Sequence, residues 1–203
     1  MRRSLYIAAV VALATIPAHA ADAPPALSGW LTTEDGAYTL LGALSGVGYT
    51  VQAGAQFWIP SESEWYKAAY YDASKNGGAG GYWLQATRSD TISGNTIGVA
   101  GSANFFDGDY VGSGNGTFPF TNALTDAGAY GANSQSYYGT NDQAGNVSEW
   151  NDGVLTASTR GLRGGSWGLG DGPLLSTARN DIPPDFQSDG IGFRIATVPE
   201  PGA

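Results

Sequence analysis

The second half of the chain, where short apolar runs alternate with glycine-containing turns, constrains the fold more than any other feature. After Gly139 these runs are short and unequal, and they predict strands at 147–150, 161–167, 174–179 and 191–196. No internal repeat of fixed period connects them. With 31 glycines and an aromatic content of 12%, the chain is expected to form one loop-rich, strand-containing domain instead of a helical bundle.

One segment carries the signals of a helix. Ser61 is a good N-cap, and Glu64 stands three residues later, where its side chain closes a capping box. Three residues that follow share one helical face by their spacing: Trp65, Ala68 and Ala69. These signals predict one clear helix near 62–71. The apolar segments 36–42 and 49–53, which precede it, predict a β-hairpin.

The stretch 73–135 is rich in Gly, Ser, Asn and aromatic residues and has no sustained period. Irregular stretches of this length are uncommon in globular domains unless something organises them. Disorder is the alternative, but aromatic residues occur throughout the stretch, and disordered tracts are poor in them. Calcium is the organiser that we expect, because it binds backbone carbonyls that a core leaves unsatisfied.

Residues 1–20 have the layout of a secretory signal, with a basic start, a short apolar run and an Ala-His-Ala end at Ala20. The apolar run is too short to span a bilayer comfortably, and a buried N-terminal helix is the alternative. Residues 21–28 are interpreted as a leader, and 29–197 as the folded domain. Cleavage after Ala20 predicts a protein that is secreted or displayed at the cell surface.

Cleavage would also change the inventory of reactive side chains. It would remove His19, the single histidine, and two of the nine basic residues, which leaves seven basic residues against 18 acidic ones. The chain has no cysteine. Without imidazole or thiolate, ordinary zinc, copper and haem sites and Ser-His or Cys-His catalytic groups are excluded. The acidic balance suits hard cations such as calcium and disfavours nucleic acid as a partner.

Five segments, taken in their order, resemble the formylglycine-generating-enzyme, or sulfatase-modifying-factor, domain. They include Trp58-Ile-Pro-Ser-Glu-Ser-Glu-Trp-Tyr-Lys-Ala-Ala69, Asn104-Phe-Phe106, Tyr138-Gly-Thr-Asn-Asp-Gln-Ala-Gly-Asn-Val-Ser-Glu-Trp150, Leu162-Arg-Gly-Gly-Ser-Trp167 and Ile191-Gly-Phe-Arg194. The resemblance implies an α+β, C-type-lectin-like fold, loop-rich and with short antiparallel strands. The segment 198–203, which begins Val-Pro-Glu-Pro, resembles the remnant of a PEP-CTERM sorting tail of exported Gram-negative proteins. Membrane anchoring is expected only through a missing part of that tail.

Two departures from the resembled family bear on activity. Enzymes of that family bind copper through two cysteines that follow the Arg-Gly-Gly-Ser segment, whereas the interval 167–179 here contains no sulfur. The related iron-dependent sulfoxide synthases need histidines, which the mature chain would lack. Neither copper nor iron is therefore expected. In addition, the family's opening strand and first helix, which precede the Gly36 region, have no counterpart in this sequence.

The resemblance also implies structural calcium at two places. The first set of ligands would be the Asp142 side chain, the Gly145 and Val147 carbonyls and the Glu149 carboxylate. The second set would be Asn104, the Phe105 carbonyl, Asp126 and the Gly128 carbonyl. Carboxylates together with carbonyls suit calcium well. The alternative for the first set is that Asp142 caps a turn and Glu149 is a solvated strand residue.

Three arginines and two tryptophans invite both a structural and a functional interpretation. In the resembled fold, such arginines brace aromatic and carboxylate neighbours inside the domain, and ligand recognition is the alternative for Arg163, Arg179 and Arg194. Trp150 and Trp167 are interpreted first as core residues and second as platforms on which sugars stack.

Three functions remain open. The first is a non-catalytic, exported, calcium-stabilised module that binds or scaffolds at the cell surface or in the matrix. Its partner would be an extracellular polysaccharide or a surface protein, held by the exposed loop 168–190. The second is a formylglycine-generating oxidase that acts on a sulfatase cysteine. The third is a fragmentary relative with no independent function.

Overall fold

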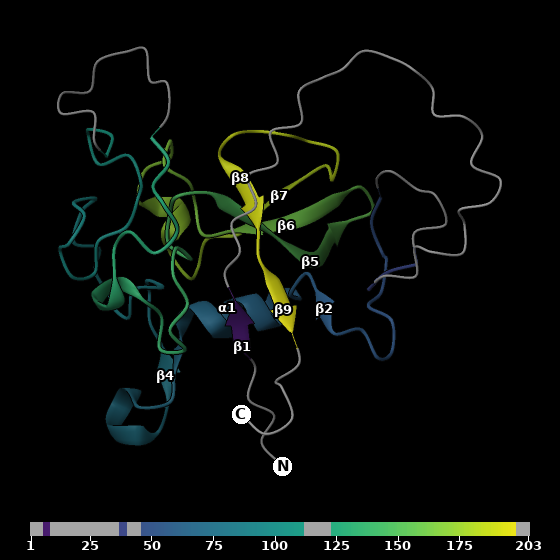
Figure 1. Ribbon diagram of the computed structural model, residues 1–203, viewed down its shortest axis with the longest axis horizontal. Coiled ribbons are helices and arrows are strands. Elements are labelled where there is room, and N and C mark those ends of the chain that lie inside the picture. The colour runs from purple at the N-terminus through teal and green to yellow at the C-terminus, as the bar shows by residue number, and fades with distance from the viewer. Residues whose placement is uncertain (1–5, 9–36, 40–45, 112–122, 198–203) are drawn as a thin grey trace.

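The computed structural model describes residues 6–8, 37–39, 46–111 and 123–197. Within these ranges it contains one α-helix, three short 3₁₀ helices and short strands in three small sheets. The predicted α+β, loop-rich fold is therefore confirmed. In Figure 1 the helix lies beside the largest sheet, while long irregular segments gather around β4 on one side of the molecule.

The largest sheet has the strand order β7–β6–β5–β8. β5 (Ser148–Thr156) and β6 (Thr159–Arg163) form an antiparallel hairpin, and β7 (Asn180–Ile182) pairs with the other edge of β6. β8 (Ile191–Phe193) runs parallel to β5, which departs from the expectation that the strands are antiparallel. This parallel pair places β8 beside Ser148–Trp150, at the start of β5.

Two smaller sheets complete the arrangement. β9 (Ile195–Thr197) lies between β1 (Tyr6–Ala8) and β2 (Phe57–Trp58), and both pairings are antiparallel. β1 falls within the segment that the sequence predicts to be a cleaved signal. β3 (Tyr71–Asp72) and β4 (Gly81–Tyr82) form the third sheet.

The predicted helix is present as α1 (Glu62–Tyr70). Its capping box is complete: the Ser61 hydroxyl accepts from the Glu64 N–H at 3.3 Å, and the Glu64 carboxylate accepts from the Ser61 N–H at 2.9 Å. The helix ends where Tyr71 takes an extended conformation. The expected hairpin before the helix is represented by an antiparallel bridge between Tyr38 and Val51, and the rest of 36–42 lies outside the described residues.

The strand predicted at 174–179 is wrong. Leu174 ends a short 3₁₀ helix, η3 (Gly172–Leu174), and no strand begins until Asn180. The reason is that Arg163 Nη1 donates to the carbonyls of Ser176 at 3.0 Å and Ala178 at 2.5 Å, so a guanidinium takes the place of a neighbouring strand.

The boundaries of the β5–β6 hairpin also differ from those predicted at 147–150 and 161–167. β6 ends at Arg163, before the predicted Trp167, because Gly164 and Gly165 follow with φ of 92° and 69°. β5 continues to Thr156, where it pairs with Thr159 across the turn.

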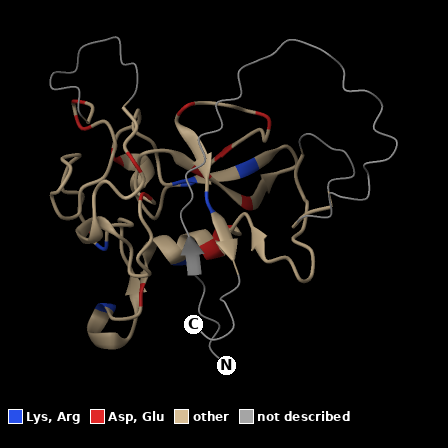
Figure 2. Ribbon diagram, viewed as in Figure 1, with Lys and Arg blue, Asp and Glu red and all other residues tan. Residues whose placement is uncertain are grey.

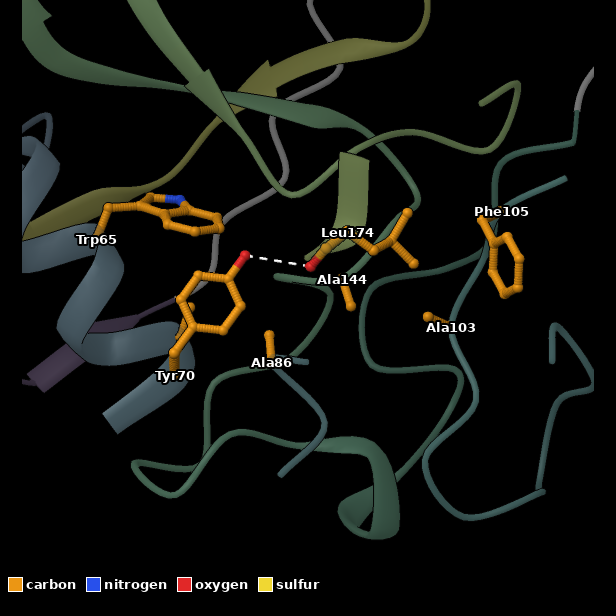
Figure 3. Packing of buried hydrophobic residues seen from close by; sticks show 8 residues of the cluster. Trp65, Tyr70, Ala86, Ala103, Phe105, Ala144 and Leu174 are labelled. Carbon is orange, nitrogen blue, oxygen red and sulfur yellow. Dashed lines mark hydrogen bonds between the residues drawn. The ribbon is translucent and has the colours of Figure 1, made fainter. Parts of the chain in front are cut away.

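The hydrophobic core is small and rich in alanine. Figure 3 shows its buried cluster, which consists of Trp65, Ala69, Tyr70, Ala86, Ala103, Phe105, Ala144 and Leu174. The Tyr70 hydroxyl donates to the Leu174 carbonyl at 3.2 Å and so links α1 to η3. Short side chains allow α1 and the loops to approach closely, so polar groups of the loops are drawn into the interior.

Two further 3₁₀ helices, η1 (Lys75–Gly78) and η2 (Ala132–Ser134), lie in the loop-rich half. No helix in the described ranges has the length and apolar character needed to cross a bilayer.

Candidate functional site

The segment 142–149, which leads into β5, runs through the interior of the protein. Every residue from Gln143 to Glu149 is buried. Three positions bend the backbone with positive φ, namely Asp142 (58°), Gly145 (77°) and Asn146 (64°). A Cβ at Gly145 would overlap the carbonyl of Asn104, so only glycine fits there. We call residues 142–149 the hub segment.

Hydrogen bonds tie the hub segment to the loop that contains Asn104. The Asn146 N–H donates to the Asn104 carbonyl at 2.7 Å. The Asn146 side-chain oxygen accepts from Asn104 Nδ2 at 3.0 Å and from the Thr125 N–H at 3.1 Å. Asn146 Nδ2 donates to the Thr125 carbonyl at 3.2 Å. The Asn146 side chain thus joins three stretches of the chain. Its amide oxygen and nitrogen both have partners, as buried polar groups generally do.

Gln143 joins the hub segment to the helix. Its Nε2 donates to the carbonyl of Trp65 at 3.3 Å, and its side-chain oxygen accepts from the hydroxyl of Thr140. Both Gln143 and Asn146 are only 2% exposed, so these bonds hold in a medium of low dielectric constant.

Glu149 ends the hub segment and forms a buried ion pair. Arg194 Nε and Nη2 donate to its two oxygens at 2.5 Å each, and Trp65 Nε1 donates to Oε2 at 2.7 Å. Arg194 also donates to the carbonyl of Asn141 at 3.1 Å. Both charged residues are 2% exposed. The pair therefore has bidentate geometry, which strengthens the attraction, although Arg194 Nη1 is buried without a partner.

The first predicted set of calcium ligands is only partly brought together. Asp142 and Glu149 both lie within electrostatic reach of Arg194. Burial raises the pKa of Asp142 above its usual value, although the N–H of Gly128 at 2.6 Å and the charge of Arg194 act in the opposite direction. Glu149 is the residue that fits a metal poorly, because Arg194 and Trp65 already bind its oxygens. Gly145 and Val147, which stand between Asp142 and Glu149 in the sequence, are buried.

The second predicted set contains an oxygen that is free to bind. Asn104 is 2% exposed, and its Oδ1 has no hydrogen-bond partner, while its Nδ2 also donates to the carbonyl of Ala123 at 2.8 Å. The Phe105 carbonyl accepts from Asn95 Nδ2 at 3.1 Å, and Asp126 is exposed. Gly128 lies next to the first set, because its N–H binds Asp142. In the described part of the chain, no three His, Cys, Asp or Glu residues come together as a ready metal cluster.

The sequence does not reveal the part that two residues play in this region. The helical spacing places Trp65 on one face of the helix, but its indole N–H also orients Glu149. No sequence signal points to Thr125, whose backbone binds Asn146 and whose buried hydroxyl has no partner. Asn146 lies within the quoted motif, and its position between a glycine and an apolar residue could have identified it as a turn residue with a buried amide.

Comparison with known proteins identifies the family. Residues 39–198 match the sulfatase-modifying factor enzyme 1-like domain. The chain belongs to this family. No curated protein sequence matches it.

Three solved structures are similar to this family member. CarF shares 22% sequence identity, with a TM-score of 0.48, over 75% of this chain and 51% of that chain. Variable protein 1 of Treponema denticola shares 20% identity, with a TM-score of 0.45, over 74% of this chain and 51% of that chain. PvdO from Pseudomonas aeruginosa shares 20% identity, with a TM-score of 0.44, over 70% of this chain and 52% of that chain. The chain spans about half the length of each.

The copper chemistry that the resemblance brings with it does not fit this member of the sulfatase-modifying factor enzyme 1-like family. A thiolate copper site needs cysteine, and the sequence has none. In the interval where the two cysteines would be expected, Leu174 is fully buried in the core and the N–H of Ser176 donates to the Leu84 carbonyl at 2.8 Å. The interval 167–179 therefore contributes to the packing of the domain.

The arginines of this family member brace carboxylates, as expected. Arg163 pairs with Glu62 at 2.5 Å, and Arg179 lies 3.5 Å from the same carboxylate. Arg163 also lies over the ring of Tyr66, with its guanidinium carbon 5.0 Å from the ring centroid. These contacts, together with the Arg194 pair, agree with the structural interpretation of Arg163 and Arg194, whereas Arg179 is exposed and only approaches Glu62.

Proposed function

We propose that this chain is a non-catalytic, exported member of its family that binds or scaffolds at the cell surface or in the extracellular matrix. The observation that carries the proposal is the structural role of the Glu149 side chain at the end of the hub segment. Its acid, Glu149, and the arginine of the last motif, Arg194, are both consumed by a buried ion pair that holds strands together. A chain that also lacks cysteine belongs to the family but has no thiolate with which to bind copper.

The loop between β6 and β8 supports a binding role. Two large apolar side chains lie exposed on it, Leu169 at 40% and Phe186 at 52%. Figure 1 shows the part between β7 and β8 projecting beyond the largest sheet, and Figure 2 shows acidic residues along it. Exposed irregular loops on a rigid scaffold are common places for recognition. The partner proposed for this surface is an extracellular polysaccharide or a surface protein.

Of the two predicted sets of calcium ligands, the second is the one that we propose binds calcium. The buried, unpartnered Oδ1 of Asn104 favours the second set, in which Asp126 would supply a carboxylate and Phe105 and Gly128 would supply carbonyls. A cation there would satisfy an oxygen whose isolation otherwise costs stability. A cation in the first set would have to displace Arg194 from Glu149.

Two experiments test the proposal. The first incubates the chain with copper and a sulfatase-derived peptide and seeks the aldehyde product by mass spectrometry, with an active family enzyme as the positive control. We expect no product, and turnover would instead establish the oxidase activity. The second applies the chain to immobilised polysaccharides. Phe186→Ala should reduce retention, while Phe57→Ala should not, since Phe57 is also exposed (58%) but lies on β2. Failure of every polysaccharide to retain the chain, or equal retention of both variants, would contradict the loop assignment.

A further inference from the structure

We propose that an open pocket beside β4 binds a carboxylate-bearing sugar, a hexuronic acid residue. The inference rests on the proposed function as a binding module, to which it adds a second site and a ligand class. The pocket has a volume of about 420 Å³, which is within the range of small-molecule sites. The argument uses five of its lining residues: Asp72, Trp83, Thr87, Arg88 and Asn133.

Arg88 supplies a cation that pairs with no acid among the residues the structure describes. Its Nε donates to the Gln135 carbonyl at 3.2 Å, and in the described ranges it belongs to none of the ion pairs. Its φ is 58°, a conformation that arginine rarely adopts. The turn around it is closed by the Gln85 N–H, which donates to the Ser89 carbonyl at 2.9 Å. The backbone of this turn is therefore fixed, and the exposed guanidinium, bonded to Gln135, keeps donors to spare in a planar fork that matches a carboxylate.

Thr87, next to Arg88, carries a second unused group. Its side chain lines the pocket and is 5% exposed, and Oγ1 has no hydrogen-bond partner. A buried hydroxyl without a partner destabilises the free protein. Because Oγ1 itself is buried, a ligand hydroxyl would remove this cost only after a rotation of the Thr87 side chain that turns Oγ1 into the pocket. This observation is independent of Arg88 and points to a ligand that carries hydroxyls as well as charge.

The other walls of the pocket suit a sugar ring. Trp83 provides aromatic surface, and its orientation is fixed because Nε1 donates to Asp72 Oδ2 at 3.0 Å and Lys75 Nζ lies 3.7 Å from the ring centroid. Asn133 offers an amide on the opposite segment, whose carbonyl accepts from the Gly101 N–H at 3.2 Å. A few polar groups placed around an apolar wall are typical of sites that orient a small polar ligand.

Charge explains why Arg88 should dominate the selectivity. The chain has 18 acidic residues against nine basic ones, so most of its surface repels a carboxylate. β7 and the exposed loop that follows it are themselves acidic, with Asp181 on the strand and Asp185 and Asp189 in the loop. A uronic acid unit is therefore expected to bind at Arg88 and not beside Asp72, whose carboxylate also lines the pocket and accepts from Trp83 and Ser74.

The test is calorimetric titration of the full chain with trigalacturonate and with its methyl ester, which has the same ring but no charge. We expect trigalacturonate to bind at least about tenfold more tightly than the ester, because hydrogen bonds to charged groups are worth more than neutral ones. Arg88→Gln should abolish that difference, and Arg88→Lys should restore part of it. Thr87→Val should weaken the binding of both ligands several-fold without lowering the midpoint of thermal unfolding. Lys67→Gln removes the same charge from α1, outside the pocket, and should change nothing.

Equal binding of acid and ester, or unchanged selectivity in Arg88→Gln, would overturn the inference. The two proposals fail separately. If other polysaccharides retain the chain while trigalacturonate does not bind, the pocket assignment is wrong and the binding module stands. If no glycan of any kind binds, both are wrong.

Discussion

Glu149 and Arg194 join β5 to the link between β8 and β9 through two hydrogen bonds of 2.5 Å, and Trp65 of α1 adds a third to the same carboxylate. The two residues come from separate motifs, 45 positions apart. One buried ion pair, together with the Trp65 indole, therefore links the helix, the largest sheet and the sheet that contains β9. This contact explains why both motifs are present in a chain that lacks the family's copper ligands.

Removal of one partner of this pair should be costly. We expect Glu149→Gln to lower the free energy of unfolding by about 3–5 kcal/mol, because Arg194 would keep a buried charge without a counter-ion. Urea unfolding followed by tryptophan fluorescence measures the change. The double variant with Arg194→Met should be less destabilised than the sum of the single variants. Additive losses would show that the pair is not coupled.

Gly145 should tolerate no side chain. Gly145→Ala places a Cβ against the Asn104 carbonyl at a φ of 77°. Gly108 has almost the same φ, 78°, and no atom within 4 Å of its Cβ position. Gly108→Ala should cost about 1 kcal/mol from backbone strain alone, and Gly145→Ala at least twice as much. Similar losses in the two variants, measured by thermal unfolding, would contradict the steric explanation.

Calcium should stabilise the protein. At a concentration one hundred times its Kd, a ligand specific for the native state adds about 2.7 kcal/mol. We expect Asp126→Asn to reduce this gain while leaving the stability in chelator unchanged, since Asp126 is exposed. Asp185→Asn, at another exposed acid, serves as the control. An unfolding midpoint of the native chain that does not respond to calcium would refute the proposed site.

The ionisation of Asp142 should oppose folding. Because burial raises its pKa in the folded state above the ordinary value of 3.8, the unfolded chain releases the proton more readily. The native state is therefore favoured below pH 3.8, and this advantage is lost as the pH rises through the raised pKa. Asp142→Asn removes the penalty and also suits the positive φ. In chelator, the variant should be more stable at pH 7, and the difference should shrink towards pH 3. A variant that is less stable at pH 7 would contradict this.

Local signals in the sequence are enough to predict the helix, whereas the contacts of the arginines follow only from the family resemblance. Ser61 and Glu64 define the start of α1 because the capping box depends on four consecutive residues. The hairpin of β5 and β6 was located, but its ends were not, because they are set by Gly164 and by the turn after Thr156. The strand predicted at 174–179 failed for a tertiary reason, since Arg163 binds the carbonyls there.

The candidate site was harder to predict than the fold. Family resemblance placed Asp142 and Glu149 as metal ligands, and sequence alone could not show that Arg194 had claimed Glu149. The pocket with Thr87 and Arg88 carries no motif at all. It depends on a guanidinium that, in the described ranges, bonds to the Gln135 carbonyl but to no acid, and on a buried hydroxyl without a partner; both become visible only when their neighbours are placed.

The hub segment has a consequence for how such a domain can diversify. Because Gln143, Asn146 and Glu149 fasten the interior by directional bonds, the correct assembly of the chain depends little on what its outer turns contain. Mutations that alter recognition can then accumulate at the periphery without a folding penalty. An architecture of this kind is well suited to acquiring new ligands over evolutionary time.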